Sequence, residues 1–322
     1  MTRKYLDPAR ISRTPFVAAL DTIAPIPSSI DFRAAFGPIV NQGAIGDCTG
    51  CSLAGMLQGM RGVAGLPFVP FDIAEIYYEE RAVEGDPTTD TGANPPDGLN
   101  FLQRVGAAPA QDGPPPDVLE TTPPSAQVLA AGAPYKIASW AAVSRVNSTD
   151  ARTAVLPVLQ LLAQKVPIEI AIAVHQSFES APGGRVPMPG SPPQDPFLGG
   201  HALVLCGYQD DTAAPGGGWH IFRNSWSPAW GDGGYGYLPY AYLADQYLCY
   251  GLWSATLPQE VNPVSASQEI VVNGKSIGMG RMIVPGEVWA PVRMLAEGLG
   301  ATVEHVTTAS GQGEVLITLP KA

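Results

Sequence analysis

The apolar positions in the first half of the chain repeat at the spacing of a helix. In residues 48–63 the large apolar side chains fall on one face, which predicts a helix that begins at Cys48. The members of this face are Leu53, Met56, Leu57 and Met60. Further helical patterns cover residues 71–83 with Asp72 as N-cap, residues 97–106, and residues 151–165 with a kink at Pro157.

The second half of the chain changes to the two-residue alternation of strands. The alternating segments, separated by Gly/Pro loops, are residues 167–175, 201–209, 219–226 and 234–243. Helices followed by a mostly antiparallel sheet predict an α+β fold with a cleft between its two parts. Residues 107–134 are rich in proline, and we expect them to form a connector.

Changes in composition divide the chain into segments. Residues 1–26 run into a Pro/Ser-rich stretch, "APIPSS" at residues 24–29, and are predicted to be an extended lead-in to a main domain over residues 27–257. Residues 258–267 are predicted to be a linker, and residues 268–322 a small α/β domain. The elements expected in this last domain are a hairpin at Asn273-Gly274, a helix from Pro291 to Gly300, and strands over residues 301–306 and 313–319.

Composition and charge exclude several classes of protein. Hydrophobic residues make up 45% of the chain and charged residues 15%, which predicts a dense core. The formal charge of −11 comes without a Lys/Arg cluster, so we expect no nucleic acid partner. Apolar stretches such as residues 168–174 are far shorter than the roughly 20 residues of a membrane span. We therefore expect no transmembrane segment, and we identify no secretion signal.

Cys48 has the features of a nucleophile. It follows a glycine-rich turn in "NQGAIGDCTG" and starts a predicted helix, where the helix N-terminus lowers the pKa of a thiol. A nucleophilic thiol needs a base. His201 is the best candidate among the four histidines, because two glycines precede it and it opens a predicted strand.

Two further residues complete a catalytic set. Asn224 offers a side-chain carbonyl that can accept from the imidazole N–H, and Trp226 can shield that bond from water. Gln42 lies six residues before Cys48 and can donate its amide N–H to an oxyanion, beside the backbone N–H of Cys48.

Four segments, in this order, resemble the papain-like cysteine peptidases: "SSIDFR", "NQGAIGDC", "GGHALVLCGY" and "NSWSPAWGDGGYGYLP". The resemblance implies Cys48 as nucleophile, His201 as base, Asn224 as orienting residue and Gln42 as oxyanion donor. It also implies a two-lobed α+β fold, with a helical lobe and a lobe formed by an antiparallel sheet or barrel. Such an enzyme hydrolyses peptide bonds without a metal or organic cofactor, and its partner is a peptide or protein substrate.

Residues 77–103 resemble the segment that bacterial members carry between the nucleophile helix and the substrate cleft. By this resemblance Gly92 and Ala93 would lie near the bound peptide. We expect Gly200 and Trp226 to line the same substrate site.

The chain departs from the family pattern near the nucleophile. Family members usually carry a cysteine three residues before it, engaged in a disulfide, but this chain has Ile45 there. Thr49 stands where an aromatic residue is common, and Ser227 where glycine is usual. We therefore expect the nucleophile loop to be stabilised by other contacts. No long inhibitory pro-segment is expected, and the hypothesis is that the lead-in itself lies across the cleft.

The last domain resembles the small module named after the N-terminal domain of copper amine oxidases, in "VNGKSI" and "VPGEVWAPVRMLAEGLGATVE". His305 is its one candidate nitrogen ligand, so we expect no copper site. By resemblance the module occurs in envelope or secreted bacterial proteins. This favours an extracellular or cell-envelope location and association with a surface.

The cysteines and the acidic loop allow other interpretations. Cys48 and Cys51 spell C-x-x-C, the pattern of a redox pair or of half a zinc site, although a second ligand pair is missing. Cys206 and Cys249 are the remaining candidates for a disulfide. An acidic loop could hold calcium, but its spacing fits no EF-hand and a solvated loop is favoured. Its members are Glu84, Asp86 and Asp90.

The sequence therefore predicts a papain-like cysteine endopeptidase. Two alternatives remain open. One is a peptide ligase or transpeptidase, in which an amine outcompetes water at the acyl-enzyme. The other is a non-catalytic binding protein on the same fold. For His175, His220 and His305 a structural role is favoured.

Overall fold

The computed structural model describes residues 26–110 and 118–258 in full, and the backbone of five strands between residues 267 and 318. The chain divides into two units, Met1–Pro258 and Gln259–Ala322. The predicted lead-in lies outside the described residues except for its last residue, and so does the predicted helix from Pro291 to Gly300. All of the predicted site residues belong to the first unit.

The helices of the first half of the chain gather around α1, which begins at Cys48 as predicted. They are α1 (Cys48–Val63), α2 (Ile73–Val83), α3 (Pro95–Arg104) and α4 (Ala126–Gly132). Asp72 caps α2, because its side chain accepts the N–H of Glu75 at 3.0 Å. The expectation of a plain connector over residues 107–134 was wrong in part, since α4 lies inside it and is capped by Ser125.

An antiparallel sheet of seven strands forms the rest of the first unit. Its order is β2-β7-β3-β4-β5-β6, and β1 pairs with β4. The strands are β1 (Ser29–Asp31), β2 (Ser139–Ala142), β3 (Ile168–His175), β4 (Phe197–Asp210), β5 (Gly218–Arg223), β6 (Tyr235–Pro239) and β7 (Cys249–Thr256). The edge strands β2 and β6 are not paired with each other, so within the described residues the sheet is open. Of the two predicted forms, an antiparallel sheet or a barrel, the sheet is found.

The structure differs from the predicted elements where proline intervenes. Residues 234–243 were expected to be one strand, but β6 ends at Pro239, which has no N–H to continue the ladder, and α8 (Tyr240–Ala244) follows. The predicted kinked helix over residues 151–165 is two helices, α5 (Ala151–Ala154) and α6 (Leu156–Ala163). Pro157 lies in the first turn of α6, where its missing N–H costs nothing.

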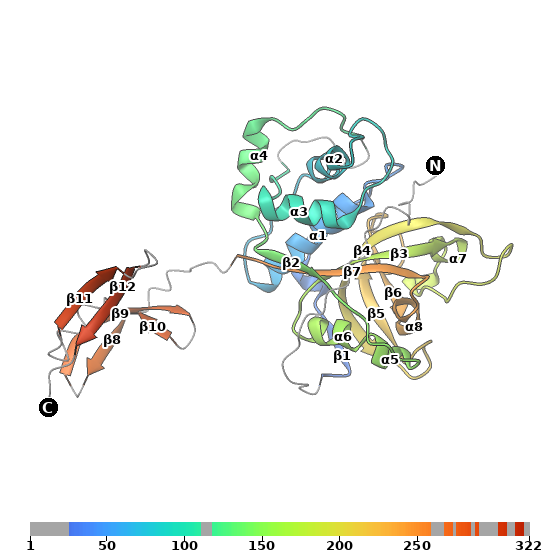
Figure 1. Cartoon of the computed structure of the whole chain (residues 1–322). Helices are drawn as coiled ribbons and strands as arrows, with labels where there is room; N and C mark the ends of the chain where they lie inside the picture. Colours follow the sequence, from blue (N-terminus) through green and yellow to red (C-terminus); the bar gives the residue numbers. More distant parts are fainter. Residues whose placement is uncertain are drawn as a thin grey trace. The chain divides into compact units, whose positions relative to one another are not determined.

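The sheet is covered on both faces. Figure 1 shows α1 between the sheet and the other helices of the first half of the chain. Along β4, Ala202 and Val204 belong to the apolar cluster around α1, whereas Leu203 and Leu205 belong to the cluster with α6 and α8. The alternation follows from the two-residue period of a strand. Small side chains, Ala202 in β4 and Ala171 in β3, face α1 and allow its close approach.

Short elements and the second unit complete the description. The short elements of the first unit are α7 (Gln176–Glu179) and 3-10 turns at Arg33–Ala35, Ala133–Tyr135 and Pro182–Gly184. The strands of the second unit are β8 (Ser267–Val272), β9 (Lys275–Val284), β10 (Glu287–Trp289), β11 (Thr302–Thr307) and β12 (Gly313–Thr318). Val272 pairs with Lys275, as the predicted hairpin requires, and β11 pairs with β12.

Candidate active site

Cys48 lies at the N-terminus of α1, against strand β4. Its side chain is fully buried, and the backbone N–H of Ala202 contacts the thiol. Ala202 directly follows His201 in β4. The packing of α1 on β4 therefore brings the predicted nucleophile to the backbone beside the predicted base.

The surroundings of Cys48 hold its thiol protonated. The pKa of Cys48 is raised to about 12: burial is the largest cause, the N–H of Ala202 offsets part of it, and the nearby carboxyl groups of Asp47, Glu80 and Glu169 add smaller increases. The expected lowering by the helix N-terminus is therefore not found. The cost of desolvating a thiolate outweighs the helix dipole when the sulfur is fully buried.

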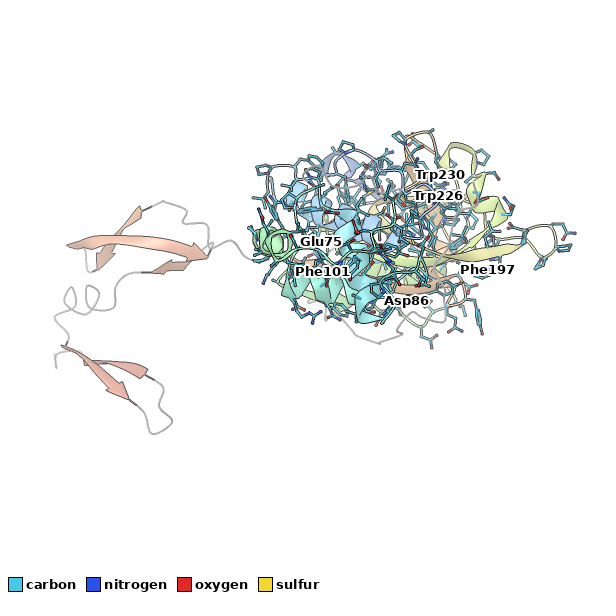
Figure 2. The ribbon with its side chains drawn as sticks, turned by 90° about the horizontal axis from the view of Figure 1, so that it is seen from above. Glu75, Asp86, Phe101, Phe197, Trp226 and Trp230 are labelled. Carbon is cyan, nitrogen blue, oxygen red and sulfur yellow. The ribbon has the colours of Figure 1, made fainter. Side chains whose placement is uncertain are left out.

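His201 makes the contacts that the sequence predicted. Its Nε2 lies 2.9 Å from Oδ1 of Asn224, and its ring stacks on the indole of Trp226 with centroids 4.7 Å apart. Trp226 lies next to Trp230 in an aromatic cluster (Figure 2). One expectation about His201 was wrong: it does not open a strand but lies inside β4, 1% exposed, because β4 begins at Phe197.

The loop before α1 is paired with the loop that follows β5. Gln42 donates its backbone N–H to the carbonyl of Ser225 at 2.9 Å, and Asn41 forms a β-bridge with Trp226. Ser225 also donates its hydroxyl to Oε1 of Gln42 at 2.5 Å. These bonds fix the position of Gln42 relative to Asn224. Sequence reasoning missed Ser225, which lies between the two predicted residues Asn224 and Trp226.

The side-chain amide of Gln42 is held in a defined orientation. Its Nε2 donates to the carbonyl of Ile45 at 2.9 Å, and the side chain is 1% exposed. An amide nitrogen carries two protons, so a second N–H remains as a donor. The loop that bears Gln42 turns back at Gly43, which has a φ of +62° that favours glycine.

Two buried glutamates lie beside the nucleophile helix. Thr49 donates its hydroxyl to Glu80 at 2.6 Å, and Ser52 Oγ lies 2.5 Å from Glu169 Oε1. Both carboxyl groups are fully buried, and burial raises the pKa of each well above its ordinary value. The sequence signalled the burial of one of them, because Glu169 lies within the apolar run of residues 168–174.

The predicted substrate residues are mostly backbone positions packed inside the unit. Gly92 is buried and donates its N–H to the hydroxyl of Tyr77 at 3.0 Å, and Ala93 next to it is 0% exposed. Gly200 lies in β4, paired with Ala173 of β3. Their contact with a substrate stays a prediction.

The other candidate sites are structural in the part of the chain that is described. All four cysteines are free, so Cys206 and Cys249 are not paired. Burial lowers the pKa of His220 to about 3, and this imidazole lies against Tyr240. Within residues 26–110 and 118–258 no three His, Cys, Asp or Glu side chains are grouped as metal ligands. No helix in the same ranges has the length and apolarity needed to cross a membrane.

Comparisons with known proteins agree with this geometry. Residues 127–243 match the model of the papain family cysteine protease, a range that includes His201 and Asn224 but begins after Cys48 and does not contain it. An uncharacterized peptidase C1-like protein of Acanthamoeba polyphaga mimivirus is 24% identical over 257 residues, 74% of this chain and 79% of that protein. A cathepsin B-like protein of Giardia intestinalis is 26% identical over 214 residues, 65% of this chain and 68% of that protein.

Solved structures give the same result for the fold. Xylellain, a cysteine protease from Xylella fastidiosa, has a TM-score of 0.63 and 27% identity, and the match covers 80% of this chain and 95% of that one. The bromelain protease from Ananas comosus has a TM-score of 0.54 at 19% identity, over 72% of this chain and 100% of that one. The chain thus has a papain-like fold, and the family model and the solved structures support a papain-family cysteine peptidase domain within it.

Proposed function

We propose that the protein is a cysteine endopeptidase, with Cys48 as nucleophile, His201 as base, Asn224 as orienting residue and Gln42 as oxyanion donor. The observation that carries the proposal is the hydrogen bond of 2.9 Å between His201 and Asn224, beside the Ala202 N–H that contacts the Cys48 thiol. Since Nε2 is engaged by Asn224, Nδ1 is the ring nitrogen that we assign to take the thiol proton.

The reaction proceeds in two steps. The proton of Cys48 passes to His201 as the sulfur attacks the peptide carbonyl, and the negative charge that develops on the carbonyl oxygen is stabilised by the Gln42 amide and the backbone N–H of Cys48. His201 then donates its proton to the leaving nitrogen, and the C–N bond breaks. Water attacks the acyl-enzyme as His201 takes its proton, the C–S bond breaks, and the proton returns to the sulfur.

The raised pKa of Cys48 makes His201 more important in this scheme. A thiol with a pKa of about 12 is almost wholly protonated at neutral pH, so attack requires a base that removes the proton during the reaction. We expect Gly92, Ala93, Gly200 and Trp226 to line the substrate site, as the resemblance implies.

One observation favours a second candidate function. The Cys48 side chain is fully buried, as a residue of a non-catalytic binding protein would be. A peptide ligase or transpeptidase uses the same acyl-enzyme and is distinguished from a hydrolase only by the group that attacks it.

Covalent labelling of Cys48 tests the proposal. The protein is treated in reducing buffer with an epoxide inactivator of papain-like enzymes, and the labelled residue is located by mass spectrometry. Labelling confined to Cys48, together with hydrolysis of fluorogenic peptides that is lost in Cys48→Ala, is the expected result. Cys51, Cys206 and Cys249 are internal controls, because they are buried free thiols like Cys48 but have no assigned catalytic role.

Loss of turnover in His201→Ala and Asn224→Ala would support their assigned roles. An unlabelled Cys48 and an absence of turnover in the intact chain would favour the binding protein. Added amines that divert the acyl group from water would favour a ligase or transpeptidase.

A further inference from the structure

The loop that carries Gln42 and leads into Cys48 is held without a covalent cross-link. All four cysteines are free, and Ile45 occupies the position three residues before Cys48. A hydrogen bond to Gly46 reaches this loop from a distant part of the chain. The N–H of Gly46 donates to Oδ1 of Asp90 at 2.9 Å, across 44 residues of sequence.

We propose that Asp90 is a positioning residue, which clasps the nucleophile loop to the segment around Gly92 and thereby aligns Cys48 and Gln42 with the bound substrate. This inference rests on the proposed function, because it assigns Asp90 a part in the same reaction. Its basis is a set of three hydrogen bonds that meet at Asp90 and Tyr77.

Asp90 connects the two segments through Tyr77. The Tyr77 hydroxyl donates to Oδ1 of Asp90 at 2.7 Å and accepts the N–H of Gly92 at 3.0 Å. Tyr77 belongs to α2 and is 1% exposed, so its hydroxyl is fixed by packing. One carboxylate oxygen of Asp90 therefore accepts from the nucleophile loop and from the residue that holds Gly92.

The loop that carries Asp90 is itself held by a buried arginine of α2. Arg81, also in α2 and 0% exposed, donates to the carbonyls of Pro87, Thr89 and Glu120. Its guanidinium lies over the Tyr77 ring, 4.2 Å from the centroid. Arg81 thus fixes the backbone next to Asp90, and the Asp90 side chain accepts the N–H of Gly46.

The contact at Gly46 lies between two predicted catalytic groups. Gly46 precedes Cys48 by two residues, and it follows Ile45, whose carbonyl accepts the amide N–H of Gln42 at 2.9 Å. A shift of Gly46 would therefore move the nucleophile and the support of the oxyanion donor together. A misplacement of about 1 Å can lower the rate of an enzyme about 100-fold.

Two substitutions of Asp90 separate geometry from charge. Asp90→Ala removes the acceptor and is expected to lower kcat/KM about 10- to 100-fold, with a fall in kcat per active site titrated by the epoxide inactivator. Asp90→Asn keeps an oxygen acceptor for Gly46 and Tyr77 and loses only the charge, so this variant is expected to retain most of the wild-type activity. Asp86→Ala is the matched control, because Asp86 (Figure 2) lies in the same acidic loop and no side-chain hydrogen bond is found for it among the described residues.

A second measurement detects the clasp without catalysis. Hydrogen–deuterium exchange of the peptide that contains Gly46 is expected to be about five- to tenfold faster in Asp90→Ala than in the wild type, since one hydrogen bond is lost. Asp90→Asn and Asp86→Ala should exchange like the wild type. If Asp90→Ala does not fold, Tyr77→Phe, which removes the hydroxyl between Asp90 and Gly92, replaces it in the kinetic measurement. Exchange is then followed at Gly92, whose N–H loses its acceptor in this variant.

The outcomes distinguish this inference from the proposed function. Unchanged exchange in Asp90→Ala, or a kcat per titrated site within twofold of the wild type, would overturn the positioning role. If the melting temperature of Asp90→Ala is lower but exchange at Gly46 and kcat are unchanged, Asp90 only stabilises the fold. Asp90→Asn as damaging as Asp90→Ala would assign the effect to charge and also overturn it. A wild type without turnover would overturn the proposed function and the catalytic part of the inference, and the exchange data would then decide whether the clasp exists.

Discussion

The imidazole of His201 stacks on the indole of Trp226, with ring centroids 4.7 Å apart and planes inclined by 24°. The stack covers the face of the ring whose Nε2 lies 2.9 Å from Asn224. A hydrogen bond that is shielded from water is stronger than one exposed to it. The orientation of His201 therefore depends on Trp226 as well as on Asn224.

Replacement of Trp226 should lower activity more than replacement of a neighbouring tryptophan. We expect Trp226→Phe to lower kcat/KM about fivefold, because an aromatic pair contributes about 1 kcal/mol. Trp230→Phe is the matched control, since Trp230 packs on Phe178, Phe222 and Trp226. It should leave kcat/KM within about twofold. Equal losses in the two variants would mean that the stack has no specific role.

The pH dependence of stability should report on Asp47. Burial raises the pKa of this carboxyl from 3.8 to about 8, so between these values the folded protein holds a proton that the unfolded chain has lost. The free energy of unfolding should then fall as pH rises towards 8, by about 1.4 kcal/mol per pH unit for one such proton. Asp47→Asn, neutral at all pH values, should remove this share of the slope in urea titrations and leave the share of Glu75, Glu80 and Glu169, whose pKa values burial also raises.

The pH window for the Asp47 measurement is set by His220. Burial lowers the pKa of His220 from 6.5 to about 3, so its unfolded form binds the extra proton below pH 6.5 and stability rises with pH there. Between pH 6.5 and 8 this opposing contribution is absent. A slope that is the same in the wild type and in Asp47→Asn over this window would contradict the assignment.

Glu169 should behave as a neutral group within the fold. Ser52 Oγ lies 2.5 Å from Glu169 and 3.0 Å from the carbonyl of Thr49. A hydroxyl has one proton, so a protonated Glu169 that donates to Ser52 satisfies both contacts. We expect Glu169→Gln to change the free energy of unfolding by less than about 1 kcal/mol and Ser52→Ala to cost about 1–3 kcal/mol, since it leaves the acid without its partner. If Glu169→Gln and Ser52→Ala lower the free energy of unfolding equally in denaturant titrations, Glu169 is not protonated in the fold.

Two glycines with similar backbone angles should respond differently to alanine. Gly85 has a φ of +85° and open space around an added Cβ, whereas at Gly106, with a φ of +90°, a Cβ would lie 2.1 Å from the carbonyl oxygen of Gly132. Both substitutions incur the strain of a left-handed conformation, about 1–2 kcal/mol. Gly106→Ala should cost a further 1–3 kcal/mol or so from the clash. Equal shifts in the melting temperature would show that the neighbouring carbonyl moves aside.

Much of the architecture followed from local patterns. The helical period placed the start of α1 at Cys48, and Asp72 was identified as a cap from its position before an apolar repeat. Alternation located strands β3, β4 and β5. The predicted boundary failed at the start of β4, because the end of a ladder depends on which neighbour can pair, and a single sequence does not contain that information. The end of β6 at Pro239 has a local cause instead, the missing N–H of proline.

For the candidate site, too, some properties followed from the sequence and others only from the tertiary structure. The sequence by itself determined which groups are present: the thiol of Cys48, the imidazole of His201 and the amides of Gln42 and Asn224, in an order that resembles a known family. Only the tertiary structure decided their state. The burial of Cys48 raises the pKa of its thiol, because desolvation depends on every atom around the sulfur. The contact of Asp90 with Gly46 joins residues 44 apart, and such a pairing forms only when the chain is folded.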